Sequence, residues 1–578
     1  MRRLVLAVVL VLLAAVAVAC GSEPSPAQRL AEALTSKNAA AAADATSDPT
    51  AATKAFTGTF DGMGDAKLQV SVTGDEDSGL SWTWKLPHDR TVEYDTSITE
   101  ADGAVRWSPT LIHPKLTAGG RLLYSDDKTY DVPVVDRKGK PVMTWQEVTV
   151  VTLDPAHADS AREVAAKLTP VTQSITAASI RADLQDAKTP VTVVSLRAAD
   201  AKKVGRLDGI AGVTTRTEGR LLTATKDLNS PVVSGLEEKW RASIDDAAGA
   251  TVLLVDAAGK PTGQVQTFDG RTPTTVETTL DVSLMRAADA AVAKEKRPTM
   301  LVAIRPSTGG ILAVAQNSAA DKQGPIALTG LYPPGSTFKT ITTAAALREG
   351  IAKPDSMLPC PGKQRFGDRV IPNDDEFDLG TVPLHTAFAR SCNTTMAALS
   401  TRLDDTALTD TARMFGLGVD YTIPGVTTIT GSVPAAKSET QKVENGIGQG
   451  TVTASPFGMA MVEASLAARR TVTPTLIQGQ STGENATPQD IPADVVDALR
   501  SMMRETVTAG TATALRDVRG LGGKTGTAEF GDGKHAHGWF TGVVGDLAFA
   551  TLVVGGDSSS PAVQVSGDFV RAVDGITP

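Results

Sequence analysis

Residues 333–339 of the chain read Pro333-Pro334-Gly335-Ser336-Thr337-Phe338-Lys339. The prolines and the glycine end the preceding structure, and apolar residues at core spacing predict a helix over 336–349 that stops at Gly350. Ser336 and Lys339 are therefore expected on one helix face, about one turn apart. A serine hydroxyl becomes a strong nucleophile when a base takes its proton, and a neutral lysine amine can act as that base. An ordinary lysine, with a pKa of about 10.4, stays protonated, so burial and a second cation nearby are expected to lower the pKa of Lys339.

Two shorter motifs follow along the chain. Ser391-Cys392-Asn393 comes after a helix-like segment at 384–390, and by itself it could be only a polar helix cap. Gly522-Gly523-Lys524-Thr525-Gly526-Thr527-Ala528-Glu529 precedes an apolar strand at 538–544. It is predicted to be the first strand of a hairpin, with a glycine that lets a ligand approach the backbone.

The order of the motifs carries more information than any one of them. Ser125-Asp126-Asp127-Lys128 repeats the spacing of the first motif and Ser36-Lys37-Asn38 that of the second, so chance matches occur in this chain. Only Ser336, Ser391 and Lys524 form the ordered triple, with separations of 55 and 133 residues. This ordered set closely resembles that of the penicillin-interacting serine transferases.

The resemblance extends beyond the three motifs over residues 270–578. The supporting segments are Thr278-Thr279-Leu280-Asp281, Ala303-Ile304-Arg305-Pro306-Ser307-Thr308-Gly309, Gly446-Ile447-Gly448-Gln449-Gly450 and Trp539-Phe540-Thr541-Gly542. Within this family the long N-terminal extension points to the class B penicillin-binding proteins, the monofunctional D,D-transpeptidases of peptidoglycan synthesis. Nothing in the chain resembles the acidic motifs of a glycosyltransferase domain. The resemblance implies a transpeptidase domain at 271–578 with the serine β-lactamase-like fold, an antiparallel sheet packed by helices.

The resemblance also assigns chemical roles. Ser336 would attack the penultimate D-alanine of a stem peptide that ends in D-Ala-D-Ala, and Lys339 would be the acylation base. Ser391 would pass the proton toward the departing D-alanine, while Asn393 would hold a substrate amide. Lys524 would hold Ser391 and lower the pKa of Lys339. The acyl group would then pass to an amine on a neighbouring stem.

A second set of residues would bind the substrate. The hydroxyls of Thr525 and Thr527, on either side of Gly526, would receive the terminal carboxylate of the stem peptide or the carboxylate of a β-lactam. The backbone N–H groups of Ser336 and Thr527 would form the oxyanion hole, in which a single donor can contribute about 3 kcal/mol. The resemblance implies no metal and no organic cofactor.

Other functions stay open at this stage. A D,D-carboxypeptidase or a β-lactamase would pass the acyl group to water. A class A β-lactamase needs a glutamate some tens of residues after the second motif, yet there is no carboxylate between Asp420 and Glu439. A catalytically silent β-lactam-binding scaffold would keep the acylation site. A β-lactam sensor would also need a membrane-spanning signalling module, which we do not find in the sequence.

The first part of the chain is predicted to be a small α+β domain. A helix begins at Gln28, and strand-like alternation follows at 68–72 and 80–84. Val105-Arg106-Trp107-Ser108-Pro109-Thr110-Leu111-Ile112-His113-Pro114 looks like the end of a cone-shaped domain similar to nuclear transport factor two. Such a domain is found in low-affinity penicillin-binding proteins of the methicillin-resistance type. We expect this domain at 28–118.

The middle of the chain is expected to be a short pedestal or dimerisation-like domain at 119–270. Val134-Val135-Asp136-Arg137-Lys138-Gly139-Lys140 resembles the Asp-Arg-Asn-Gly opening of the family's pedestal domain, with Lys138 at the Asn position. A helix-like segment at 161–168 lies between strand-like runs. The expected fold class is therefore multidomain α+β.

The N-terminus predicts where the protein works. Arg2 and Arg3 precede an apolar run, 4–19, that is shorter than the roughly 20 residues of a spanning helix. Ala17-Val18-Ala19-Cys20-Gly21-Ser22 resembles a bacterial lipobox, although Ala17 replaces the usual Leu. We expect a signal peptide at 1–20, a linker at 21–27 and a lipid on Cys20, which would anchor the protein to the outer face of the cell membrane. An uncleaved signal anchor and simple secretion are the alternatives.

Two further cysteines and a pair of histidines are ambiguous. Cys360 and Cys392 are 32 residues apart in a compartment that permits disulfides, a spacing that allows a bridge without demanding one. Two free thiols are the simpler expectation. His535 and His537 stand beside a Gly-Asp-Gly turn, so an exposed hairpin tip is favoured over a metal site.

Composition limits the possible partners. The chain has 578 residues, is 41% hydrophobic and 21% charged, and carries a formal charge of −9. These values are typical of globular domains and exclude a disordered, collagenous or polytopic membrane chain. No basic run interleaves with aromatic residues, so nucleic acid is not an expected partner. The expected partners are peptidoglycan stem peptides, β-lactams and the membrane, with cell-wall synthesis proteins left unidentified.

Overall fold

The computed structural model describes residues 23–531 and 535–573. The expected signal peptide and Cys20 lie outside these residues. Among the described residues, no helix is both long enough and apolar enough to cross a membrane. The chain divides into two compact units, one formed by residues up to Thr129 together with Ile244–Pro273, and the other by Tyr130–Ser243 and the residues from Thr274 onwards.

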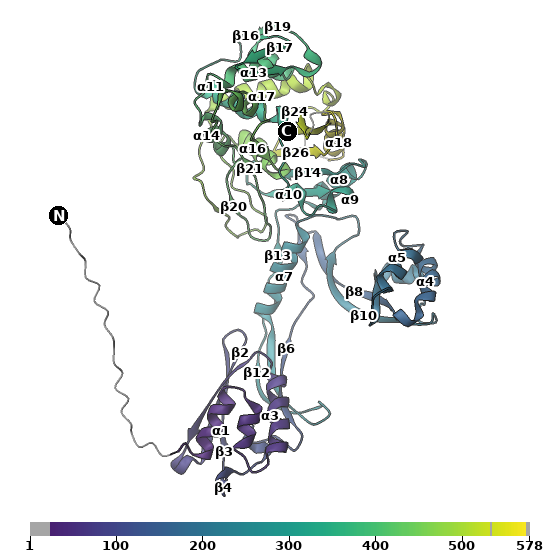
Figure 1. The fold of residues 1–578 in the computed structure, drawn as a ribbon, viewed down its shortest axis with the longest axis vertical. Coiled ribbons are helices and arrows are strands. Elements are labelled where there is room, and N and C mark those ends of the chain that lie inside the picture. Colours follow the sequence, from purple (N-terminus) through teal and green to yellow (C-terminus); the bar gives the residue numbers. More distant parts are fainter. Residues whose placement is uncertain (1–22, 532–534, 574–578) are drawn as a thin grey trace, which may run out of the picture. The chain divides into compact units, whose positions relative to one another are not determined.

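The first unit is an α+β domain in which helices pack on antiparallel strands (Figure 1). Its main elements are α1 (Pro26–Thr35), α2 (Ala39–Asp44), α3 (Pro49–Met63), β1 (Lys67–Thr73), β2 (Gly79–Leu86), β3 (Arg90–Ser97), β6 (Arg121–Asp127), β11 (Gly249–Val255) and β12 (Pro261–Phe268). Trp82 and Trp84 of β2 are fully buried in one core with Phe56 of α3. The predicted strands at 68–72 and 80–84 are confirmed as parts of β1 and β2.

The first unit extends beyond the domain border expected at residue 118. β11 pairs with β6 and with β12 in an antiparallel sheet. Leu122 of β6 and Val252 and Leu254 of β11 join the same buried core as the helices. The compact unit differs from the expected 28–118 because the strands that complete its core come from two separate stretches of the chain.

The beginning of the second unit is built on one long strand. β8 (Pro141–Leu153) pairs antiparallel with β7 (Val134–Val135), β9 (Val191–Arg197) and β10 (Val213–Thr223). Figure 1 shows α4 and α5 near one end of the β8–β10 ribbon. The associated helices are α4 (Ala161–Leu168), α5 (Ala177–Leu184), α6 (Ala198–Val204) and α7 (Val233–Ala247). The predicted helix at 161–168 is confirmed as α4.

Lys138, at the position where the pedestal pattern departs from the family, takes part in an ion pair. Its Nζ lies 2.9 Å from Oδ2 of Asp281, which a guanidinium nitrogen of Arg137 approaches to 2.8 Å. Asp281 also caps α8 (Val282–Val292), since its side chain accepts from the N–H groups of Ser283 and Leu284. The turn at 136–139 is thus tied to α8, the first helix after Thr274.

The C-terminal part of the second unit is centred on a five-stranded antiparallel sheet in the order β15-β14-β26-β25-β24. The strands are β14 (Thr299–Ile304), β15 (Ile311–Gln316), β24 (Gly522–Phe530), β25 (His535–Val544) and β26 (Leu547–Val553). Every residue of β14, β15 and β26 is buried, which requires helices on both faces. The antiparallel sheet packed by helices agrees with the fold expected from the sequence.

Side-chain contacts show which helix covers which face. Thr541 of β25 donates to Glu463 of α16 (Pro456–Ala468), and the register places Thr541 opposite Lys524. Ser566 of α18 (Ser560–Arg571) donates to Thr551 of β26, on the other face of the sheet. Because paired residues share a face, Lys524 points toward the α16 side.

Candidate active site

Ser336 sits at a tight turn that is pressed against β24. The predicted single helix over 336–349 begins instead as a 3₁₀ turn, Gly335–Phe338, and continues as α11 (Lys339–Arg348). Gly335 has a positive φ of 51°, and a Cβ there would lie 2.6 Å from the carbonyl oxygen of Thr527. Only glycine fits this close approach. Ser336 itself is half-buried, and its hydroxyl has no hydrogen-bond partner among the described residues.

Lys339 is fully buried, and its amine is directed at the second motif. Its Nζ donates to the carbonyl oxygen of Ser391 at 2.7 Å, to Ser391 Oγ at 3.1 Å and to Asn393 Oδ1 at 2.6 Å. Burial, and then the nearby cation Lys524, hold the pKa of Lys339 well below the usual range. Both conditions that the sequence required for a neutral lysine base are therefore met.

Lys524 approaches the same serine from β24. Its Nζ donates to Ser391 Oγ at 3.0 Å and to the carbonyl oxygen of Thr525 at 3.1 Å. It also lies 5.6 Å from the ring centroid of Phe388, a cation–π distance. Complete burial lowers the pKa of Lys524 to about 7. The ordered triple predicted from the sequence is thus a hydrogen-bonded cluster in which both lysines contact one serine hydroxyl.

Ser391 adopts an unusual backbone conformation. Its φ is +63°, in the left-handed region that non-glycine residues rarely enter, at a cost of about 1–2 kcal/mol. The turn joins α12 (Leu384–Ala389) to α13 (Asn393–Ser400) and lets both Ser391 and Asn393 meet Lys339. Such strain persists where surrounding contacts determine the conformation.

The candidate substrate-binding threonines differ in accessibility. Thr525 is buried and its Oγ1 lies 2.6 Å from Oγ1 of Thr511, whereas Thr527 is half-buried. A Cβ on Gly526 would lie 2.9 Å from the carbonyl oxygen of Pro334, so glycine lets β24 pack against the turn that carries Ser336. Thr511 is a site residue that the sequence reasoning missed, because no motif surrounds it.

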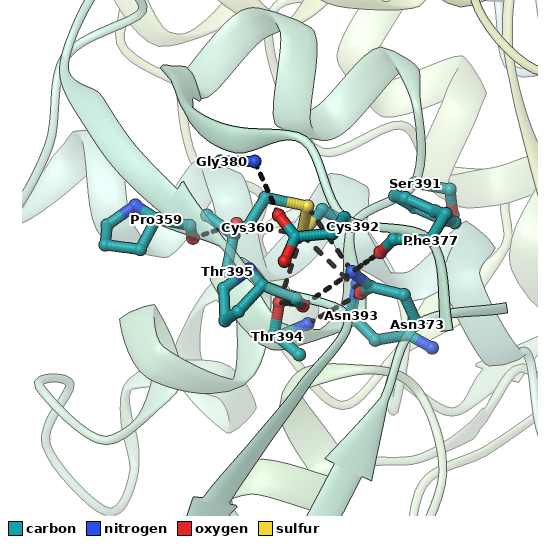
Figure 2. Close-up of a disulfide and its surroundings, with 12 residues drawn as sticks. Pro359, Cys360, Asn373, Phe377, Gly380, Ser391, Cys392, Asn393, Thr394 and Thr395 are labelled. Carbon is teal, nitrogen blue, oxygen red and sulfur yellow. Dashed lines mark hydrogen bonds between the residues drawn. A yellow bond between two sulfur atoms is a disulfide. The ribbon is translucent and has the colours of Figure 1, made fainter. Parts of the chain in front are cut away.

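A disulfide lies directly beside this cluster. Cys360, at the end of β16 (Met357–Cys360), is bonded to Cys392, the residue between Ser391 and Asn393 (Figure 2). The simpler expectation of two free thiols is therefore wrong. The Cα atoms are 6.1 Å apart, within bridging range, a proximity that the fold creates and the sequence spacing could not reveal.

The two histidines near the end of β24 behave differently. His535 is exposed, as expected for a hairpin tip, but His537 is buried in β25. His537 stacks on Phe530 with ring centroids 4.1 Å apart, and burial lowers its pKa to about 4. The expectation was wrong for His537 because β24 and β25 stay paired as far as Phe530 and His535.

Comparison with known proteins gives the family. Residues 299–572 match the model of the penicillin-binding protein transpeptidase domain. The peptidoglycan D,D-transpeptidase PbpA of Mycolicibacterium smegmatis is 30% identical over 367 residues, which cover 53% of this chain and 71% of that protein. The chain belongs to the penicillin-binding proteins. This relative and the match to the transpeptidase domain support class B within that family.

Two further comparisons set the extent of the likeness. PbpA of Mycobacterium tuberculosis is 28% identical over 329 residues, or 48% of this chain, and the match spans only 63% of that protein's length. Among solved structures, the complex between penicillin-binding protein PBP2 and MreC from Helicobacter pylori matches with a TM-score of 0.57 at 16% identity. That match covers 78% of this chain and 98% of the other chain. The fold that the two proteins share therefore extends well beyond the transpeptidase domain.

Proposed function

We propose that this penicillin-binding protein is a monofunctional peptidoglycan D,D-transpeptidase that cross-links stem peptides through an acyl-Ser336 intermediate and is acylated by β-lactams. The observation that carries the proposal is the pair of buried lysines on one serine, with Lys339 Nζ at 3.1 Å and Lys524 Nζ at 3.0 Å from Ser391 Oγ. This arrangement supplies a base with a lowered pKa and a polar route for its proton.

In the proposed acylation, Ser336 Oγ bonds to the carbonyl carbon of the penultimate D-alanine. The proton of the hydroxyl passes to neutral Lys339, and the amide bond to the terminal D-alanine breaks. Ser391, which both lysines contact, relays a proton to the amine that leaves. An amine of a neighbouring stem then attacks the ester, forms the new amide and releases Ser336.

The proposed binding groups lie around this route. Asn393 would hold a substrate amide, and the hydroxyls of Thr525 and Thr527, flanking Gly526, would bind the carboxylate. Backbone N–H groups of Ser336 and Thr527 would form the oxyanion hole. The approach of Gly335 to Thr527 supports this pairing, because it brings β24 next to the residue before the nucleophile.

We also propose how the enzyme is anchored and which subtype it is. Lipid on Cys20 would hold it to the outer face of the cell membrane as a lipoprotein, after removal of the signal peptide. The N-terminal unit would be the nuclear-transport-factor-two-like domain of the low-affinity, methicillin-resistance type. The pedestal domain would follow it along the chain. Radiolabelled fatty acid should enter the wild type but not Cys20→Ser; equal labelling of the two would refute the anchor.

The function is tested with a thioester analogue of the stem peptide and an amine acceptor. We expect acyl transfer to the amine to exceed transfer to water, and a penicillin adduct that persists for hours. Dominant hydrolysis of the thioester would instead indicate a carboxypeptidase, and rapid penicillin turnover a β-lactamase. Acylation by penicillin without turnover of any thioester would indicate a catalytically silent scaffold.

A further inference from the structure

The helix that carries Asn393 lacks a cap of its own. Cys392 is the cap residue of α13, but its side chain accepts no hydrogen bond from the first turn. The N–H groups of a first helical turn need acceptors from elsewhere. A distant residue provides one, since Asn373 Oδ1 accepts from the N–H groups of Asn393 at 2.8 Å and Thr394 at 3.2 Å (Figure 2). Asn373 lies between β18 (Arg369–Pro372) and the 3₁₀ turn Asp374–Glu376.

The orientation of the Asn373 amide is fixed by its other contacts. Its Nδ2 donates to the carbonyl oxygens of Pro361 at 2.9 Å and Phe377 at 2.8 Å. The side chain is only 3% exposed. A reversed amide would set its NH₂ group against the two N–H groups of α13, so this orientation alone satisfies all partners.

The residue before Asn373 controls the side chain of Asn393. Asn393 Nδ2 donates to the carbonyl oxygen of Pro372 at 2.9 Å, which leaves Asn393 Oδ1 to accept from Lys339 Nζ at 2.6 Å. Two consecutive residues therefore set both the main chain and the side chain of Asn393. This contact chain leads directly to the proposed base.

The disulfide holds the same turn from β16. Cys392 is covalently bound to Cys360, and the hydroxyls of Thr394 and Thr395 donate to the carbonyl oxygens of Pro361 at 2.9 Å and Pro359 at 2.7 Å. Asn373 shares the Pro361 acceptor with Thr394. The turn is thus fixed by one covalent bond and by hydrogen bonds to the carbonyl oxygens on either side of Cys360.

We propose that Asn373 is a positioning residue for acylation, which, with the Cys360–Cys392 disulfide, holds Ser391 and Asn393 against Lys339. It acts through these residues and does not touch the substrate. The inference rests on the proposed function, because Ser391 and Asn393 matter only if the cluster acylates. The competing explanation is that Asn373 stabilises the fold and leaves the chemistry unaffected.

Asn317 offers a matched control. It is also a buried asparagine that caps a helix, here as the N-cap residue of α9 (Ser318–Asp321); it accepts from the N–H groups of Thr299 and Ala320 while its Nδ2 donates to carbonyl oxygens that include that of Glu295. None of its partners belongs to the lysine–serine cluster. Asn317→Ala should therefore remove a comparable set of hydrogen bonds without reaching the site.

The experiment measures acylation of the full-length protein by a fluorescent penicillin over a range of concentrations, which separates the first-order acylation rate from the binding constant. Thermal unfolding is recorded for the same samples. We expect Asn373→Ala to lower the acylation rate at least tenfold with the binding constant changed less than threefold. Asn317→Ala should lower the melting temperature similarly but leave the acylation rate within twofold of wild type. Asn373→Asp keeps the acceptor oxygen but sets a second oxygen against the carbonyl oxygens of Pro361 and Phe377, so we expect it to lower the acylation rate as well.

The possible results distinguish the positioning role of Asn373 from the proposed function. An acylation rate of Asn373→Ala within twofold of wild type, or an equal loss in Asn317→Ala, would overturn the positioning role while leaving the proposed function intact. If Asn373→Ala does not fold, Asn373→Ser, too short to reach both N–H groups, takes its place with the same expectation. A wild-type protein that forms no adduct contradicts the proposed function, and the inference fails with it.

Discussion

The chain contains the same Ser-x-x-Lys spacing in two environments, Ser336–Lys339 and Ser125–Lys128. Lys339 is fully buried, and burial together with Lys524 lowers its pKa. The amine of Lys128 lies 2.8 Å from Asp245 and 3.3 Å from Asp126, and the hydrogen bond to Asp245 raises its pKa. One lysine is prepared to accept a proton and the other to keep it.

Secondary structure explains the other half of the contrast. Ser336 and Lys339 lie in a continuous helical stretch, where residues three apart are neighbours. Ser125 belongs to β6, an extended strand that ends at Asp127, so Ser125 and Lys128 are not neighbours on a helical turn. In this chain, the Ser-x-x-Lys spacing therefore fits a catalytic motif only where it lies on a helix and its lysine is buried.

The largest expected effect distinguishes the two serines. Ser336→Ala should lower the rate of acylation by penicillin by at least about 10³-fold, because the nucleophile is removed. Ser125→Ala should label like the wild type. Gel-based fluorescence with purified variants measures both. Labelling that depended on Ser125, or that survived in Ser336→Ala, would show that Ser336 is not the nucleophile.

A second prediction concerns the cation beside Lys339. Lys524→Met should reduce acylation about 10²-fold, since Ser391 loses one of its two lysine contacts. Acylation requires neutral Lys339, so the rate rises with pH through the pKa of that lysine. Loss of the neighbouring cation raises this pKa and should shift the acidic limb to higher pH. Acylation rates measured from pH 5 to 9.5 provide the test. An unshifted acidic limb would contradict a role of Lys524 in lowering the pKa of Lys339.

The sequence predicted the parts of the site that depend on local pattern. The order of Ser336, Ser391 and Lys524 was enough to choose the family, and helical spacing placed Ser336 near Lys339. The alternation at 80–84 likewise predicted a strand, which is β2, and the structure shows that Trp82 and Trp84 form part of its buried face.

The parts that the sequence could not predict depend on distant contacts. Asn373 meets Asn393 across 20 residues through its side chain alone, and no local pattern marks it. The bridge between Cys360 and Cys392 likewise depends on β16 lying beside α13. The border of the first unit was missed because β11 returns to pair with β6 after more than a hundred residues of another unit.

The free energy of unfolding should also depend on the pKa of buried Lys524. The pKa of Lys524 is about 7 in the folded state and about 10.4 when unfolded, so the unfolded chain binds more protons between these values. Stability contributed through this group therefore rises with pH, by about 2 kcal/mol from pH 7 to pH 9. Lys524→Met should be more stable than wild type at pH 7, and its stability should rise less over this range, since only the contribution of buried Lys339 is left. Urea unfolding at both pH values measures it; parallel pH dependence in the two proteins would argue against a depressed pKa.

The smallest effect is expected at Lys128. Its raised pKa has the opposite sign, so the ion pair stabilises the fold below the ordinary lysine pKa and is lost above the raised one. Because the pair is partly exposed, Lys128→Ala should cost at most about 1 kcal/mol and leave acylation unchanged. A loss of several kcal/mol, or any change in acylation, would show that the two motifs are less different than their surroundings indicate.

Ser336, activated by a neutral buried lysine, is expected to form a stable acyl-enzyme. Intact mass spectrometry of the wild type and of Ser336→Ala, followed for hours after addition of penicillin, tests it most directly. We expect a wild-type mass increased by one penicillin, an adduct that persists, and no adduct in the variant. An unmodified wild type, an adduct that survives in Ser336→Ala, or an adduct that disappears within minutes would contradict it.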